Sequence, residues 1–493
     1  MYNYYSSGFI GCQAPDVVTF IHFWAWQYNK IYVNVAKKNC PMGHLLSSKE
    51  DARKITLYIN KQTYQLEKER SFLEMYRCED KERLPLWKRL EDKVGSELTD
   101  SLKSLYDTYD QKMVEWMASL YDDEIGGWYF SKSAQQSEGY LPDIESTIEA
   151  LDFINSSGMS QKPYGEVIPD WLKHKVAYFV NSLQAPDGYF YHPQWGREVS
   201  NLRKSRDVDT AMRILKAVGA EPKYLIPISS AANSSNYDIN NAPERFRSKE
   251  NYLSYIESLD ILHRSYNAGS EMLSQLGEIH AFGKMLEIDF MEITMNWLDK
   301  NENSENGLWQ DSISYYGVNG LHKISWIYNS HGRLIPYADN ALDSAIEIVL
   351  SDKTPNATVD LYNPWHAIGE LRKNKQHYSP EGYEAFVEKI YAFAVRGIKQ
   401  SKEKIIAFKK PDGGLSYLMN TSTPTAQGAP IAVPGSAEGD VNGTLCGSVA
   451  MINSIYTALG IEEYRVPMFG ENELYAYIGF LEKKHEKRGK SND

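Results

Sequence analysis

The chain has 493 residues, of which 42% are hydrophobic, 24% are charged and 13% are aromatic, with 35 tyrosines among them. This composition excludes a mostly disordered chain, because disordered segments are poor in aromatic and apolar residues. The formal net charge of −12 gives no general attraction for nucleic acid, whose binding proteins usually carry a basic face. We therefore expect a folded protein without a nucleic-acid partner.

Three features bear on the compartment. The four cysteines are scattered and form no CxxC pair, which is typical of free thiols in a reducing environment. The most apolar early stretch, Val17 to Trp26, has about half of the ~20 residues that a membrane-spanning helix needs. The first basic residue is Lys30, whereas a secretory signal begins with positive charge. We expect a cytoplasmic protein with no membrane contact, ending in a solvated charged run from Lys483 to Asp493.

Helices are predicted where apolar residues recur at intervals of three and four. In chain order these segments are Leu102 to Leu120, Ile148 to Ile154, Trp171 to Leu183, Met212 to Val218, Met272 to Leu298, Phe386 to Phe408 and Val449 to Leu459. The glycines expected to end helices in the left-handed conformation are Gly158, Gly219, Gly332 and Gly460. The acids expected at helix starts, as N-caps or first-turn residues, are Asp143, Asp207 and Asp440.

Loops that combine glycine with aromatic residues separate these segments. Examples are Gly126-Gly127-Trp128, Pro186-Asp187-Gly188-Tyr189, Asn306-Gly307-Leu308-Trp309 and Pro411-Asp412-Gly413-Gly414. The repetition predicts an all-α fold, a single (α/α)6-type toroid of helical hairpins with the Gly/aromatic loops on one face. An open superhelix such as a tetratricopeptide array is the competing architecture.

The predicted toroid spans residues 96–465. Residues 1–95 are expected to form an N-terminal segment with helices that pack on it, and residues 466–493 a C-terminal helix and charged tail. The polar stretch Pro222 to Pro243 is interpreted as an insertion loop within the ring.

In such a ring the inner helices begin at one face, so residues at their starts surround one cavity. The catalytic candidates are Asp207, His322, His192, Tyr316 and His366. The substrate-binding candidates are Arg206, Asp143, Trp195, Trp309, Asn363, Trp365 and Asp440.

Structural roles compete with these assignments. An Asp at a helix start is more often a cap than a catalyst. Arg206 and a neighbouring acid can form a purely structural ion pair, and a lone loop histidine such as His192 is usually structural. The sequence has no HExxH metal motif, GxGxxG fingerprint, phosphate-binding P-loop or GxSxG elbow, so we expect no metal and no cofactor. The loop Gln427 to Gly439 is long enough to act as a lid.

The runs Asp143-Ile144-Glu145-Ser146-Thr147 and Asp207-Val208-Asp209-Thr210-Ala211-Met212 resemble repeats of the α/α-toroid superfamily. That superfamily includes terpenoid cyclases and protein prenyltransferases, and similar toroids carry polysaccharide lyases and hairpin-type glycoside hydrolases. The resemblance covers about residues 100 to 460 and implies the architecture rather than one activity. The DxDD motif of class II cyclases is incomplete, because Thr210 follows Asp209.

These observations favour a carbohydrate-active enzyme whose partner is an oligosaccharide or polysaccharide, and a uronic-acid-containing glycan in particular. Cleavage by β-elimination would use Asn, Arg or His to neutralise the uronate and Tyr or His as the base. Hydrolysis would use two carboxylates. The imidazole, Arg and Tyr side chains favour the lyase slightly. The alternatives are a terpenoid-cyclase-like isoprenoid enzyme and a non-catalytic sugar-binding toroid.

Overall fold

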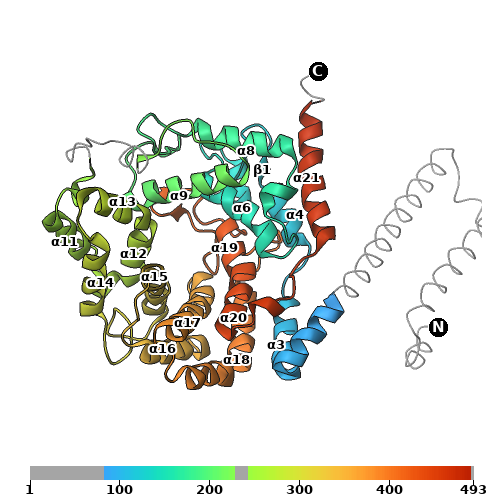
Figure 1. Ribbon diagram of the computed structural model, residues 1–493. Coiled ribbons are helices and arrows are strands. Elements are labelled where there is room, and N and C mark those ends of the chain that lie inside the picture. The colour runs from blue at the N-terminus through green and yellow to red at the C-terminus, as the bar shows by residue number, and fades with distance from the viewer. Residues whose placement is uncertain (1–82, 228–241, 490–493) are drawn as a thin grey trace, which may run out of the picture. The chain divides into compact units, whose positions relative to one another are not determined.

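The computed structural model describes residues 83–227 and 242–489, which belong to the second of two units of the chain, Glu79–Asp493. These residues are mostly helical (Figure 1), as the sequence predicts. Strand within them is limited to two short antiparallel pairs: β1 (Tyr121–Asp122) with β2 (Gly127–Trp128), and β3 (Thr425–Ala426) with β4 (Ala429–Pro430). The boundary expected at residue 95 falls inside this unit.

One set of helices is linked by helix–helix contacts in a closed cycle, in which the last segment contacts the first (Figure 1). In chain order these inner helices are α6 (Ile144–Ser156), α9 (Asn201–Ala217), α12 (Ile261–Ser274), α15 (Tyr315–His331), α17 (Val359–Tyr378), and α19 (Val441–Leu445) continued through the π-turn Cys446–Ala450 into α20 (Met451–Leu459). Each packs against the next, and α19 packs against α6 again.

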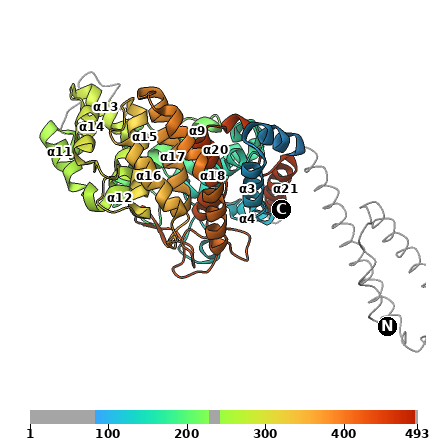
Figure 2. The same ribbon diagram turned by 90° about the horizontal axis from the view of Figure 1, so that it is seen from below.

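A second set of helices precedes the inner ones along the chain, one before each. These outer helices are α4 (Lys112–Ser119), α8 (Asp170–Ser182), α11 (Lys249–Ser258), α14 (Phe290–Asn301), α16 (Ala338–Leu350) and α18 (Tyr383–Ile405). Contacts link α8 to α9, α16 to α17 and α18 to α20, and α16, α17 and α18 lie side by side (Figure 2). Along the described chain, one helix of the second set thus precedes each helix of the first set, with α13 lying between α12 and α14.

The remaining elements pack around these two sets. Helix α3 (Ser96–Tyr106) contacts α18, α13 (Leu276–Leu286) contacts α14, and α21 (Glu471–Gly489) contacts α4. The shorter elements are α5 (Lys132–Gln136), α7 (Tyr164–Val167) and the 3-10 turns Glu244–Phe246, Ile406–Phe408 and Glu462–Tyr464.

Several predicted helix limits are wrong. The segment Leu102 to Leu120 is divided between α3 and α4, and Met272 to Leu298 is divided among α12, α13 and α14. The break before α14 follows Glu287, whose φ of 55° is left-handed and ends a helix. The charged run from Lys483 is helical to Gly489 rather than frayed, with Lys483, Glu486 and Lys487 exposed as expected. Lys484 donates hydrogen bonds to the carbonyls of Ser119 and Tyr121.

The predicted caps are confirmed for two of the three acids. Asp143 and Asp440 each accept a hydrogen bond from the third backbone N–H that follows, at the starts of α6 and α19. Asp207 is not at a helix start, because α9 begins six residues earlier, at Asn201, with Ser200 as its N-cap. The predicted left-handed C-terminal glycines are confirmed at Gly158, Gly219, Gly332 and Gly460, with φ between 67° and 87°.

The Gly/aromatic loops place their large rings in the core. Trp128 and Trp309 of these loops are 0% exposed, as is Trp365 within α17, and Trp309 donates its indole N–H to the Leu298 carbonyl. Trp365 donates its indole N–H to Ser401 Oγ. These rings thus contribute apolar burial to the fold.

The glycines of these loops allow them to approach neighbouring helices closely. Gly307 has φ 64°, and a Cβ there would lie 2.3 Å from the backbone nitrogen of Ala341 in α16. Gly413 has φ 106°, and a Cβ there would lie 2.8 Å from the carbonyl oxygen of Lys112 at the start of α4. The second contact joins the loop after α18 to the first outer helix, so it links distant parts of the sequence.

We predict that Gly307→Ala lowers the free energy of unfolding by about 2 kcal/mol or more, because it adds a backbone clash to left-handed strain. Gly219→Ala is the matched control, since Gly219 also has positive φ, 73°, but a Cβ there would meet no described atom within 4 Å. We expect the control to lose about 1 kcal/mol. Equal losses in chemical denaturation would show that the contact with α16 contributes nothing.

Candidate functional site

A cavity of about 840 Å³ opens among the inner helices. All six inner segments contribute to its wall, together with the β3–β4 hairpin. The polar and ionisable lining includes Glu145 and Glu149 from α6, Arg206 and Asp209 from α9, Tyr266 and Asn267 from α12, Lys323 from α15, Tyr362 and Asn363 from α17, and Asn442 and Cys446 from the last inner segment. A wall of this kind can bind a polar ligand through hydrogen bonds and ring faces.

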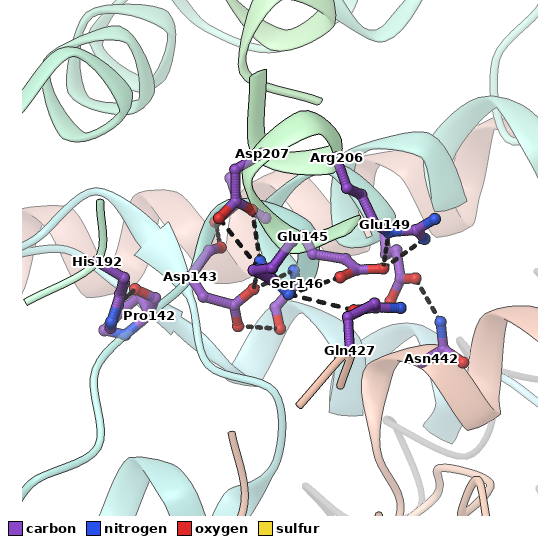
Figure 3. Close-up of polar contacts among 12 residues, drawn as sticks. Pro142, Asp143, Glu145, Ser146, Glu149, His192, Arg206, Asp207, Gln427 and Asn442 are labelled. Atoms are coloured by element: carbon purple, nitrogen blue, oxygen red, sulfur yellow. Dashed lines mark hydrogen bonds and ion pairs between the residues drawn. The ribbon is translucent and has the colours of Figure 1, made fainter. Parts of the chain in front are cut away.

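A buried ion network joins α6 and α9 beside this cavity (Figure 3). Arg203, which is 1% exposed, donates to both carboxylate oxygens of Asp207 at 3.0 and 2.6 Å and to Glu145 Oε2 at 2.8 Å. Arg206 donates its Nε–H to Glu145 Oε1 at 2.6 Å. Burial by itself would raise the pKa of Glu145, but Arg206 and Arg203 hold it below its ordinary value. Glu145 is therefore an ionised carboxylate.

Glu149 lies one helical turn after Glu145, and its surroundings shift its pKa in the opposite direction. Burial, reinforced by the negative charge of Glu145, raises the pKa of Glu149 well above its ordinary value. Asn442 donates to Glu149 Oε1 at 2.5 Å (Figure 3), while Glu149 Oε2 is buried and has no hydrogen-bond partner among the described residues. Its surroundings therefore favour the protonated form of Glu149, in contrast to Glu145.

Further polar groups without partners face the same space. Asn363 is 1% exposed and lies against the Tyr266 hydroxyl, although neither its Nδ2 nor its Oδ1 makes a hydrogen bond of good geometry within the described part of the chain. Burial and the positive charge of Arg206 lower the pKa of Lys323 to about 8. Because buried polar groups are normally hydrogen-bonded, these groups mark a place where a ligand or water completes the structure.

The structure places three of the predicted substrate-binding residues on the cavity wall. They are Arg206, Asp143 and Asn363. Asp143 is largely occupied as a cap, since Oδ1 accepts from the Ser146 N–H and Oδ2 from the Ser146 hydroxyl. Asp440 is a fully buried cap outside the wall, and it also accepts the Tyr417 N–H. Asp207 lies behind the wall, where both of its oxygens bind Arg203.

The three predicted histidines do not line the cavity. His192 is 3% exposed, bonds through Nε2 to the Pro142 carbonyl at 2.9 Å and stacks on Trp195. His322 and His366 pack edge to face, with ring centres 4.3 Å apart. Burial lowers the pKa of His322 well below its ordinary value and the pKa of His366 to about 4, so both are neutral at pH 7. They lie within α15 and α17 rather than at the helix starts that the sequence suggested.

The aromatic candidates from the sequence lie off the cavity wall. Trp309 and Trp365 are buried in the core, Trp195 packs on His192, and Tyr316 is exposed with its hydroxyl donated to Asn267 Oδ1. Among the Gly/aromatic loops, Tyr189 and Tyr417 do reach the wall. The aromatic surface of the cavity comes mainly from within the inner helices, at Tyr266, Trp326 and Tyr362.

Two residues outside the predicted set organise the site. Arg203 was missed because it stands in a polar run with no helical periodicity before Asp207. Glu149 was missed as a site residue because a single acid inside a helix looks like an exposed one. Its spacing of four residues from Glu145 was the available signal, since residues at this spacing share one helix face.

The expected lid loop contributes to the wall. Gln427, at the turn between β3 and β4, accepts a hydrogen bond from Arg203 through Oε1 at 3.3 Å. Its backbone carbonyl accepts from Ser200 Oγ at 3.4 Å, and the Pro430 carbonyl accepts from Gln194 Nε2 at 2.6 Å. Most of the expected insertion loop, and residues 1–82 of the expected N-terminal segment with Cys12, Cys40 and Cys78, lie outside the described residues.

Two features are absent from residues 83–227 and 242–489. No group of three or more His, Cys, Asp or Glu side chains is arranged to hold a metal ion. No helix in these ranges combines the length and the apolar character needed to cross a membrane.

Comparison with protein-family models, with curated proteins and with solved structures gives no significant match for this chain.

Proposed function

We propose that the described helices form an (α/α)6-type toroid around this cavity. Two independent observations support the proposal. The six inner segments contact one another in a cycle that returns from α19 to α6. The loop that contains Gly413, after the last outer helix, packs against the start of α4, the first outer helix. An open superhelix would leave its first and last hairpins apart.

Within this architecture we infer a carbohydrate-active enzyme that cleaves glycosidic bonds in the cavity. The observation that carries this function is the pair of carboxyl groups on α6. Two arginines lower the pKa of Glu145 and keep it ionised, while burial and Glu145 raise the pKa of Glu149 and keep it neutral. Carboxyl groups whose environments drive their pKa values apart are typical of acid–base enzymes. Glu149 is the group able to protonate a leaving-group oxygen, through Oε2, which has no partner among the described residues.

Hydrolysis also needs a base or nucleophile. Glu145 is engaged by Arg203 and Arg206, which makes it a weak base. Asp209 lines the same cavity from α9, is exposed and has room to orient a water molecule. We therefore propose Glu149 as the acid and Asp209 as the base of a hydrolytic reaction on an oligosaccharide or polysaccharide.

β-Elimination on a uronic-acid-containing glycan is the second candidate. Arg206 together with Tyr266, Tyr362 and Tyr417 on the wall favours it, because this chemistry needs a cation for the carboxylate and a base for the adjacent proton. The position of His322, His366 and His192 off the wall weakens the preference for a lyase that the sequence suggests. The many ionisable side chains of the wall also argue against a hydrocarbon substrate of the terpenoid-cyclase type.

A panel of neutral and uronic-acid-containing polysaccharides separates these candidates. We expect new reducing ends without ultraviolet absorbance, the result of hydrolysis. Reducing ends accompanied by the absorbance of an unsaturated product would instead support β-elimination. Binding to glycans without any cleavage would leave a sugar-binding toroid, and turnover of an isoprenoid diphosphate alone would overturn the carbohydrate assignment.

We predict that Glu149→Gln lowers kcat by about 10²- to 10⁴-fold, the usual contribution of a general acid. The amide keeps an oxygen for the hydrogen bond from Asn442, so we expect the fold to be retained. In the wild type, activity should decrease as pH rises through the raised pKa of Glu149, because the acid must be protonated to act. That limb of the pH–rate profile should be missing from the residual activity of the variant.

Glu302→Gln is the matched control. Burial raises the pKa of Glu302 to about 8, but Glu302 ends α14 away from the cavity and accepts the Tyr337 N–H. Folding keeps this acid neutral up to about pH 8, whereas the unfolded chain ionises it near the ordinary glutamate pKa of 4.5. As pH rises from about 4.5 to about 8, the free energy of unfolding of the wild type should therefore fall relative to that of the variant. The kcat of the variant should equal that of the wild type. A comparable loss of kcat in both variants would remove the special role of Glu149.

A further inference from the structure

Lys323 is a cavity-lining lysine whose ammonium group has no acceptor among the described residues. It projects from α15, and its Nζ makes no hydrogen bond or ion pair within residues 83–227 and 242–489. Its contact with Tyr266 is of the cation–π kind, with Nζ 5.9 Å from the ring centre. A charged amine in such a place is poorly compensated, which favours its neutral, nucleophilic form.

Lys484 shows what a stabilised buried lysine looks like in the same protein. Burial lowers the pKa of both lysines to about 8. Lys484 Nζ, however, donates to the carbonyl oxygens of Ser119 and Tyr121 at 2.8 and 2.6 Å and does not line the cavity. The two residues differ in bonding and in access to the cavity, and of the two it is Lys323 whose amine faces a ligand-sized space.

The stem of Lys323 is fixed by close packing between α12 and α15. A Cβ on Gly269 of α12 would lie 2.8 Å from the Lys323 Cβ, so the absent side chain of Gly269 leaves room for the lysine stem. Proton donors line the same cavity: the hydroxyls of Tyr266, Tyr362 and Tyr417, and Glu149, whose protonated form is favoured by burial. An amine and acids held in one cavity are the groups needed for carbonyl chemistry.

We propose that Lys323 is a covalent attachment site for a small polyhydroxylated aldehyde or ketone, such as an open-chain sugar, through a reversible imine. The Lys323 nitrogen adds to the carbonyl carbon and then loses a proton, while the carbonyl oxygen takes up a proton to become a hydroxyl. This hydroxyl leaves as water after a second protonation, while the nitrogen lone pair forms the C=N bond. Addition of water reverses the sequence, and no oxidant or reductant is consumed. The site does not require that the protein cleave glycosidic bonds.

The charge state of Lys323 depends on groups from every neighbouring inner helix. The ionisable groups that face it or act on it are Glu145 and Glu149 of α6, Arg206 of α9, Tyr266 of α12, His322 of α15, Tyr362 and His366 of α17, Tyr417, and Cys446 in the π-turn. Arg206 disfavours the ammonium form, and Glu145 favours it. At pH 7 roughly a tenth of a lysine with a pKa near 8 is a free amine, against fewer than one in a thousand of an ordinary lysine.

The test is reductive trapping of the full-length protein with glyceraldehyde and sodium cyanoborohydride at pH 7, followed over time by peptide mass spectrometry. We expect the glyceraldehyde adduct on Lys323 to form at least tenfold faster than on Lys88, whose side chain is 64% exposed and ion-paired at the surface. Between pH 6 and 10 the rate at Lys323 should rise and level off above about pH 8, whereas the rate at Lys88 should continue to rise throughout.

Two further lysine comparisons make the result decisive. Lys323→Arg keeps the positive charge but cannot form an imine, so its corresponding peptide should carry no adduct while the other lysines react as before. Lys484 should react at least tenfold more slowly than Lys323 despite its similarly lowered pKa. Trapping of Lys323 no faster than Lys88, or of Lys484 as fast as Lys323, would overturn the proposed site. Because trapping needs no glycan turnover, its failure is distinct from failure of the proposed glycosidase activity.

Discussion

The guanidinium of Arg203 is the interaction on which the site depends. It is 1% exposed, and its charge is matched within hydrogen-bonding distance by Asp207 of its own helix and Glu145 of α6. Removing one partner of such a buried set typically costs about 3–5 kcal/mol, because the remaining charge stays buried without compensation. Burial by itself would lower the pKa of Arg203, but Asp207 and Glu145 raise it, so the group remains charged and ties α6 to α9. The network thereby fixes the relative position of the two helices that hold the carboxyl groups of the cavity.

The state of Glu149 follows from this constraint. Two like charges one helical turn apart repel each other, and here both side chains are buried. Arg203 and Arg206 decide which of the two acids ionises, because both donate hydrogen bonds to Glu145. The proton therefore resides on Glu149, where Asn442 from the last inner segment orients one oxygen. A structural ion network and a candidate acid are thus consequences of the same arrangement, and Asp207 acts as a positioning residue for that acid.

The helical class and many local features could be predicted from the sequence, since these depend on neighbouring residues. The Asp143 and Asp440 caps and the left-handed glycines are examples, because capping needs only a side chain and the backbone three residues away. The start of α9 could not be located, since Leu202 is the one apolar residue between Asn201 and Arg206 and α9 packs against α6, α8 and α12, which are distant in the local sequence pattern. The sequence also does not indicate which side chains of α15 point toward the cavity. His322 and Lys323 are adjacent in sequence, yet a rotation of about 100° per residue turns one into the helix packing and the other to the cavity.

The packing between α12 and α15 explains why Lys323 takes that direction. A Cβ on Gly320 would lie 2.2 Å from Ser265 Oγ, and a Cβ on Gly269 would lie 2.8 Å from the Lys323 Cβ. Small residues on both helices thus allow the backbones to approach closely, and that approach leaves no space for a long side chain between them. The Lys323 stem must pass along the interface and end in the cavity, where it meets the ring of Tyr266. The amine that faces the cavity at this position is therefore a consequence of the helix contact that closes this part of the wall.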